Sequence, residues 1–133
     1  MKSKIYTEQE IILLKQNPFV LDIKYNRFIE YDPIFKLWCV LAKNLYPEVS
    51  ARSLFYIAGF PLQIMNPNLP QKRILAWRNI FFRYGKEYFL YSKDYEMLNI
   101  IPVKNMEINR ESTNDLKTRI YSEVRAMLEN EKR

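Results

Sequence analysis

The sequence predicts a predominantly helical protein that also contains one small β-hairpin and ends in an amphipathic helix. Three observations support this fold class. Only 2 of the 133 residues are glycine, which disfavours architectures with many tight turns. Capping residues precede several apolar segments, as they do at helix N-termini. Within those segments, apolar side chains recur at the three- and four-residue spacing of helices.

The first elements are a short helix and the hairpin. The run Thr7-Glu8-Gln9-Glu10 is a capping box, so a helix begins there. It should end near Gln16, because Asn17 precedes a proline and is biased away from the helical conformation. Residues 19–31 follow as two short strands around a turn at Tyr25-Asn26, because asparagine tolerates the positive φ of tight hairpin turns.

Two further helices follow the hairpin. Asp32-Pro33 combines a side-chain cap with a proline at the first helical position, and this helix ends at Pro47. Ser50 caps a short helix to about Ala58, which Gly59 closes. Residues 61–69 form an irregular, proline-rich connector.

A longer helix starts behind Pro70, runs from about Gln71 to Tyr84, and ends at Gly85. One broad face should point to the core and carries Ile74, Trp77, Ile80, Phe81 and Tyr84. The opposite face carries Lys72, Ala76, Asn79 and Arg83, with Arg73 and Arg78 towards the flanks. This layout suits a helix that enters a DNA groove, and it equally suits a surface helix with a solvated basic face.

The chain divides into a domain of residues 1–103 with its core in 5–85, a polar linker at 104–113, and a C-terminal helix within 114–133. Residues 86–103 show no decisive pattern. The C-terminal helix has an apolar seam of Leu116, Ile120, Val124, Met127 and Leu128. The seam packs either on the chain's own core or on a second subunit as a short coiled coil, and the polar linker favours the second alternative.

The net charge of the chain indicates which classes of partner it could bind. The chain has 21 Lys and Arg against 15 Asp and Glu, a net charge of +6 and a pI near 9.4. This balance fits a polyanionic partner, either nucleic acid or an anionic membrane face. The membrane is disfavoured because the cations are not gathered on one strongly amphipathic helix. The N-terminus lacks the apolar run of a signal peptide, so we expect a cytoplasmic protein.

The sequence lacks histidine and shows no grouping of side chains that is typical of a catalytic site. The chain has no histidine, which excludes Cys/His zinc sites and Ser-His or Cys-His catalytic arrangements. The single cysteine, Cys39, lies in an apolar run and is expected in the core. The aspartates are scattered and form no metal triad or acid–base pair. We therefore expect no enzymatic activity, cofactor, metal or small-molecule substrate.

A short helix, a connector and a longer helix with a basic outer face form a helix-turn-helix-like module. Seven segments in this order are informative together: Tyr6-Thr7-Glu8-Gln9-Glu10, Asn17-Pro18-Phe19-Val20, Ile29-Glu30-Tyr31-Asp32, Ser50-Ala51-Arg52-Ser53-Leu54-Phe55, Ala58-Gly59-Phe60, Lys72-Arg73-Ile74 and Trp77. They resemble small bacterial helix-turn-helix proteins similar to the DNA-binding N-terminal halves of insertion-sequence transposases. The resemblance covers roughly residues 5–85 and implies DNA binding through the helix Pro70–Tyr84 and a following helix that pairs subunits. The connector is longer than the family pattern.

The sequence thus predicts a double-stranded-DNA-binding protein, either a transcriptional regulator or a transposition-associated protein. Lys72, Arg73, Asn79 and Arg83 are expected to face the major groove, and Arg78, Lys86 and Arg52 to contact phosphates. A homodimer through Leu116, Ile120, Val124 and Met127 would suit repeated half-sites. The alternative is a protein–protein interaction adaptor or inhibitor encoded by a mobile element. That alternative predicts no DNA binding and an exposed apolar patch around Phe82 and residues 88–91.

Overall fold

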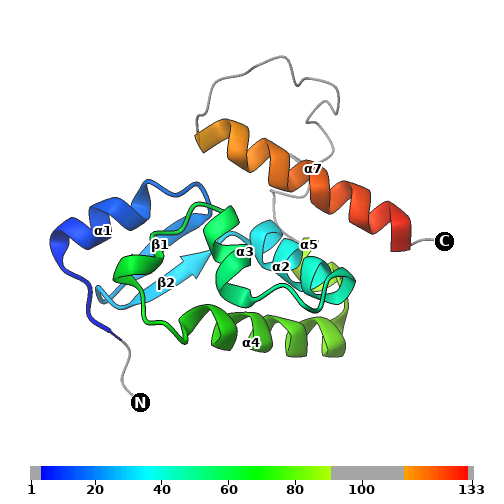
Figure 1. Ribbon diagram of the computed structural model, residues 1–133, viewed down its shortest axis with the longest axis horizontal. Helices are drawn as coiled ribbons and strands as arrows, with labels where there is room; N and C mark the ends of the chain where they lie inside the picture. Colours follow the sequence, from blue (N-terminus) through cyan, green and yellow to red (C-terminus); the bar gives the residue numbers. More distant parts are fainter. Residues whose placement is uncertain (1–3, 91–112, 132–133) are drawn as a thin grey trace.

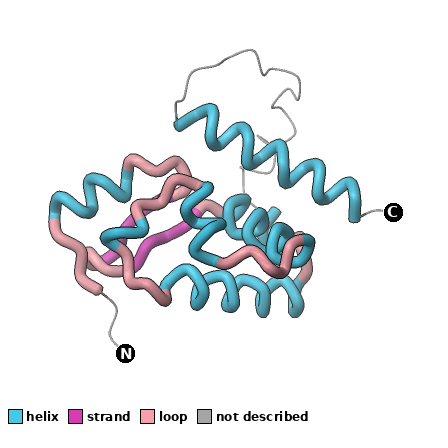
Figure 2. The backbone as a smooth tube through the Cα atoms, viewed as in Figure 1, coloured by secondary structure: helices cyan, strands magenta, loops and turns pink. Residues whose placement is uncertain are grey.

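The computed structural model describes residues 4–90 and 113–131, which are mainly helical with one two-stranded antiparallel sheet, as predicted (Figures 1 and 2). Helix α2 is the central element, with α7 packed on one side and α4 on the other (Figure 1). The elements in chain order are α1 (Glu8–Lys15), β1 (Val20–Lys24), β2 (Phe28–Tyr31), α2 (Pro33–Leu45), α3 (Ala51–Ile57), the 3-10 helix η1 (Leu62–Ile64), α4 (Leu69–Tyr84), α5 (Glu87–Leu90) and α7 (Thr113–Glu131).

The N-terminal elements form where the local sequence specifies them. At the start of α1, Thr7 Oγ1 accepts from the Glu10 amide at 3.2 Å, and Glu10 Oε1 accepts from the Thr7 amide at 3.0 Å. The hairpin pairs Lys24 with Phe28. Tyr25 and Asn26 have φ values of 57° and 55°, so the turn lies where it was predicted.

Phe35 of α2 lies at the centre of an aromatic cluster that joins the hairpin and three helices. Its ring centroid is 5.1 Å from that of Phe19, 5.3 Å from Phe55 and 5.9 Å from Trp77. These rings are buried and come from the segment before β1, from α3 and from α4. Aromatic burial of this kind dominates core energetics, so the cluster fixes α4 against the rest of the chain.

The C-terminal helix packs on α2 of the same chain, which is the intrachain alternative left open by the sequence. Ile120, Val124 and Leu128 are buried, and Leu116 and Met127 are partly buried against the same core. The indole Nε1 of Trp38 also donates to Glu123 Oε1 at 2.8 Å. Homodimerisation through this seam stays a prediction, and it would require α7 to leave α2.

Asp32 is fully buried and joins α2 to α7. Its Oδ1 accepts from the Ile34 amide at 2.9 Å as the N-cap of α2, and its Oδ2 accepts from the Tyr121 hydroxyl at 2.5 Å. We expect Asp32→Ala to lower the free energy of unfolding by about 2–4 kcal/mol. A cap contributes about 1 kcal/mol, and a buried hydroxyl that loses its partner costs about 1–3 kcal/mol.

Urea unfolding followed by tryptophan fluorescence measures this loss. Asp22→Ala, at a half-buried position of β1, is the matched control and should cost less than about 1 kcal/mol. Equal losses for the two variants would contradict the role assigned to Asp32.

Two expectations about α4 need correction. Tyr84 was placed on its core face, yet it is 59% exposed and stacks on Tyr88 with ring centroids 5.7 Å apart. The reason is that α4 ends at Gly85, where φ is 79°, and α5 then buries Phe89 in its place. Ala76, expected on the outward face, is half-buried against the core.

The linker predicted at 104–113 lies outside the described residues except for Thr113, which instead begins α7. Among residues 4–90 and 113–131, no helix has the length and apolar character needed to cross a membrane.

Candidate nucleic-acid interface

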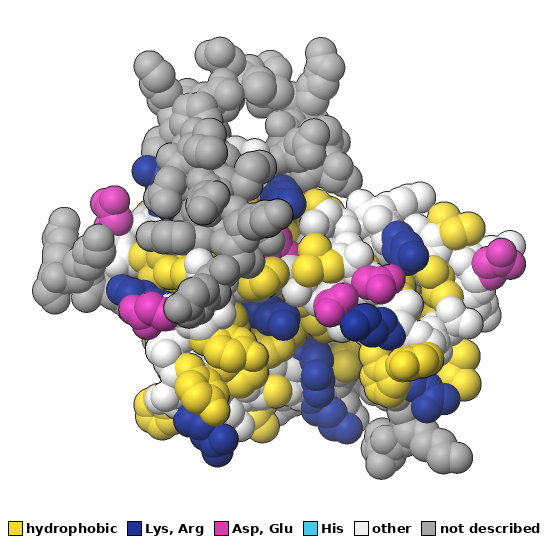
Figure 3. Space-filling model, turned by 180° about the vertical axis from the view of Figure 1, so that it is seen from behind, with side chains coloured by type: hydrophobic (Ala, Val, Ile, Leu, Met, Phe, Trp, Pro, Cys, Tyr) yellow, Lys and Arg dark blue, Asp and Glu magenta, His cyan; other side chains and the backbone are white. Residues whose placement is uncertain are grey.

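Helix α4 has a basic outer surface, and its inner surface packs in the hydrophobic core. Its 16 residues include four Lys or Arg and no Asp or Glu. Ile74 and Trp77 are buried, and the Trp77 ring stacks on Phe55 of α3 at a centroid distance of 6.1 Å. In Figure 3, where α4 runs along the lower edge, Lys and Arg side chains alternate with hydrophobic ones.

Three of the predicted site residues share the outward face of α4. Lys72, Asn79 and Arg83 are all exposed, at positions i, i+7 and i+11 of the helix. Neither Lys72 nor Arg83 lies within 4.0 Å of a carboxylate among the described residues, where the ion pairs are Lys4–Glu10, Lys15–Asp22 and Lys24–Glu30. These two cations are therefore available to an external anion.

Arg52 and Arg78 come together on one flank of this face. Both are exposed, and both line a groove of about 650 Å³ between α3 and α4. Lys43 lines the groove too, but its Nζ donates to the carbonyl oxygens of Pro47 and Val49 at 2.9 and 2.6 Å. Glu48 adds a negative charge to the same wall. The two arginines are thus the cations of this groove that can contact a phosphate.

The remaining two predicted residues lie apart. Arg73 is exposed but points to the opposite flank of α4, where it lines a pocket shared with the hairpin. Lys86 is half-buried beyond Gly85. Lys72 of the outward face also lines the pocket beside Arg73. The structure therefore divides the seven predicted residues into an outward group, a groove pair, Arg73 on the pocket flank next to Lys72, and Lys86 by itself.

The connector between α3 and α4 leaves the outward face open. It packs at the start of α4, where Asn66 Oδ1 accepts from the Asn68 amide at 3.0 Å and Met65 is buried. Lys4 Nζ donates to the Ile64 carbonyl at 2.5 Å and ties the N-terminal segment to the connector. The connector therefore leaves Lys72 and Arg83 of α4 exposed.

Apolar side chains are also exposed on this face: Phe82, as the alternative reading of the sequence predicted, and Leu75, which sequence reasoning missed. Leu75 and Phe82 are 57% and 93% exposed and lie next to Asn79. With Val40, Asn44 and Phe81 they line a hollow of about 230 Å³ between α2 and α4. Leu75 and Phe82 stand at positions i and i+7 on either side of Asn79, so this exposed apolar stripe of two residues could have been found from the sequence.

Cys39 is fully buried in α2, as expected. Burial raises the pKa of its thiol, which therefore stays protonated and is a poor nucleophile. No protein-family model, curated protein or solved structure matches this chain.

Proposed function

We propose that this protein binds double-stranded DNA by placing the outward face of α4 in the major groove. The observation that carries the proposal is the exposed, acid-free outer surface of a helix whose inner surface is locked into an aromatic core. An α-helix fits the major groove, and phosphates attract cations that have no carboxylate partner.

Each group on this surface has a chemistry that suits part of a duplex. Lys72 and Arg83 are long cations for phosphates or guanine edges, and the Asn79 amide matches the donor–acceptor pair of adenine. Arg52 and Arg78, on the flank, suit phosphates of the adjacent backbone. This division follows the general rule that phosphate contacts position a protein and base contacts specify the site.

Salt dependence tests the proposal directly. A fluorescence-anisotropy titration of random duplex DNA should show binding that weakens steeply between two salt concentrations, with a log–log slope of about −0.9 per phosphate contacted. Binding of a comparable strength at both salt concentrations, or no binding at low salt, would contradict the electrostatic mechanism. Roles in transcription or transposition, cytoplasmic location and homodimerisation remain predictions from the sequence.

The apolar stripe of α4 supports a second candidate function, a protein-interaction module that does not bind DNA. Phe82 is almost fully exposed although it is large and apolar. We expect Phe82→Ser to leave the thermal midpoint within about 2 °C, because the ring packs on little.

The same variant separates the two functions. If α4 binds DNA mainly through its cations, Phe82→Ser should weaken duplex binding less than fivefold, whereas Arg83→Ala should reduce both the affinity and the salt slope. A chain that binds no duplex and whose self-association or protein binding disappears with Phe82→Ser would favour the second candidate.

A further inference from the structure

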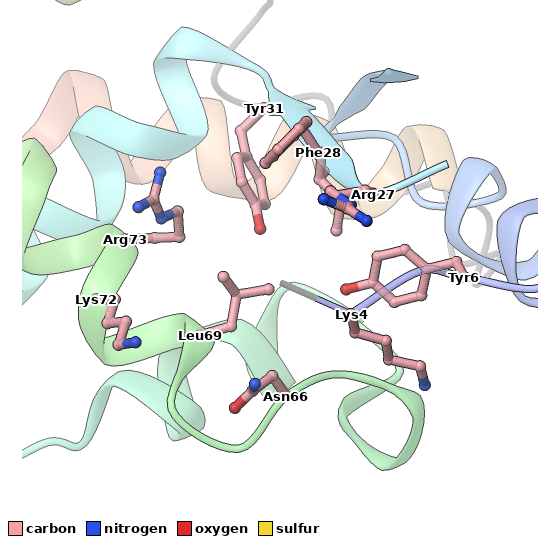
Figure 4. Close-up of a pocket in the computed structure, with 10 residues that line it drawn as sticks. Lys4, Tyr6, Arg27, Phe28, Tyr31, Asn66, Leu69, Lys72 and Arg73 are labelled. Atoms are coloured by element: carbon pink, nitrogen blue, oxygen red, sulfur yellow. The ribbon is translucent and has the colours of Figure 1, made fainter. Parts of the chain in front are cut away.

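A pocket of about 300 Å³ lies on the flank of α4 that faces away from the groove with Arg52. Three segments that are far apart in the sequence form it, namely residues 4–6, 27–31 and 66–73. The N-terminal segment is held to the hairpin turn by the Tyr6 amide, which donates to the Asn26 carbonyl at 2.8 Å. The lining residues are Lys4, Tyr6, Arg27, Phe28, Ile29, Tyr31, Asn66, Leu69, Lys72 and Arg73 (Figure 4).

The lining is strongly cationic and contains no carboxylate. Lys4 is already engaged, since its Nζ contacts Glu10 at 3.1 Å and the Ile64 carbonyl. Arg27, Lys72 and Arg73 have no carboxylate within 4.0 Å among the described residues. Three uncompensated cations around one small pocket favour an anionic ligand.

The Tyr31 hydroxyl is an independent sign of a ligand. Tyr31 is only 4% exposed, and its hydroxyl has no hydrogen-bond partner among the described residues. Figure 4 shows this hydroxyl and that of Tyr6 pointing into the pocket, with Arg27 and Arg73 on either side of Tyr31. Burial raises the pKa of the Tyr31 hydroxyl, so it stays a donor at neutral pH. A buried donor without an acceptor is unfavourable, and an anion in the pocket would supply the acceptor.

The N-terminus of α4 also favours an anion in the pocket. Leu69 is its first residue, and no side chain caps this end of the helix. The positive end of the helix dipole thus lies beside the pocket, although the Leu69 amide already donates to the Asn66 carbonyl and Pro70 has no N–H. An oxygen-rich anion suits this field and the guanidinium donors together.

The remaining lining residues point to a ring attached to that anion. Phe28 is half exposed, and its ring packs near the Arg27 guanidinium at 5.9 Å. Asn66 uses its Oδ1 on the Asn68 amide, which leaves its Nδ2 as a donor. Pockets of about 300 Å³ are at the small end of those that hold organic ligands, and an inorganic phosphate would fill only part of one.

We propose that this pocket binds a free mononucleotide, with its phosphate between the Arg27, Arg73 and Tyr31 donors and its base against Phe28. The proposal goes beyond DNA binding and does not depend on it: Arg27, Phe28 and Tyr31 belong to the hairpin, although Arg73 belongs to α4.

Isothermal titration of the full chain with adenosine 5′-monophosphate tests the proposal, with adenosine and inorganic phosphate as the two partial probes. We expect saturable binding of the nucleotide that is at least tenfold tighter than binding of either partial probe. Arg27→Ala should weaken it at least tenfold. Arg119→Ala, an exposed arginine of α7 outside the pocket and outside the proposed DNA-binding surface, is the matched control and should change it less than twofold.

Tyr31→Phe separates a ligand-binding role from a structural one. The variant removes an unpartnered hydroxyl and keeps the ring, so its thermal midpoint should be equal to or above that of the unsubstituted chain. Nucleotide affinity should nevertheless fall about threefold to tenfold. The proposal is overturned by no saturable binding up to roughly 10 mM, by phosphate binding as tightly as the nucleotide, or by unchanged affinity in Arg27→Ala.

Discussion

The double variant Lys72→Glu/Arg83→Glu is expected to lose duplex binding at moderate salt while its helical content stays unchanged. Both side chains are exposed on the outward face of α4 and pack on nothing in the core. The substitutions turn two attractive contacts with phosphate or guanine into repulsive ones, and we expect at least a hundredfold loss of affinity. Fluorescence anisotropy measures the affinity, and far-UV circular dichroism measures the helical content.

The control for this variant must make the same change in net charge elsewhere. Lys15→Glu/Arg119→Glu alters two exposed cations, one at the end of α1 and one on α7, and thus on other elements than α4. It should weaken binding by less than about tenfold, because only the long-range field of the protein changes. If the α4 variant bound DNA as tightly as the unsubstituted chain, the assignment of α4 as the DNA-binding helix would be wrong.

Val124→Asp is expected to have the largest effect on stability. Val124 is fully buried where α7 packs on α2. The substitution removes apolar packing and places a carboxylate in that interface, and we expect a loss of at least about 3 kcal/mol. Small domains have only roughly 5–15 kcal/mol in total, so urea unfolding should occur at a much lower midpoint.

Ala126→Asp is a matched control on the same helix. It introduces the same carboxylate two residues away at an exposed position, and should cost less than about 1 kcal/mol. Unfolding at two protein concentrations then distinguishes the alternatives for α7. An intrachain helix gives a midpoint independent of concentration, whereas a helix that pairs two subunits gives a midpoint that rises with it.

The helix starts and the hairpin turn are specified by contacts within a few residues. Thr7 and Asp32 accept hydrogen bonds from amides two or three residues further on, so their capping roles are visible in the sequence. Asn26 adopts the positive φ that its residue type permits. The exposure of Lys72 and Arg83 followed from helical periodicity for the same reason.

The burial of Tyr84 and the packing partner of α7 depend on how the helices pack against one another, and helical periodicity does not determine that packing. Tyr84 shares a helical face with Trp77 but is exposed, because the last turn of α4 extends past the edge of the core. Phe89 is buried in the core beyond Gly85 instead. The seam of α7 has the same sequence pattern whether it packs on α2 or on a second subunit. The hydrogen bonds from α7 to Asp32 and Trp38 show that, within one chain, the seam packs on α2.

By itself, the sequence determined the helical class, the starts of the capped helices, the hairpin turn and the basic outer side of α4, because capping, turn formation and helical periodicity act over a few residues. It did not indicate η1 or α5. The tertiary structure alone decided that α7 covers α2, that Arg73 lies apart from Arg83, and that Tyr31 faces a cationic pocket. The pocket is built from three segments separated by tens of residues. Their meeting depends on packing around Phe35, and no local pattern in the chain encodes that packing.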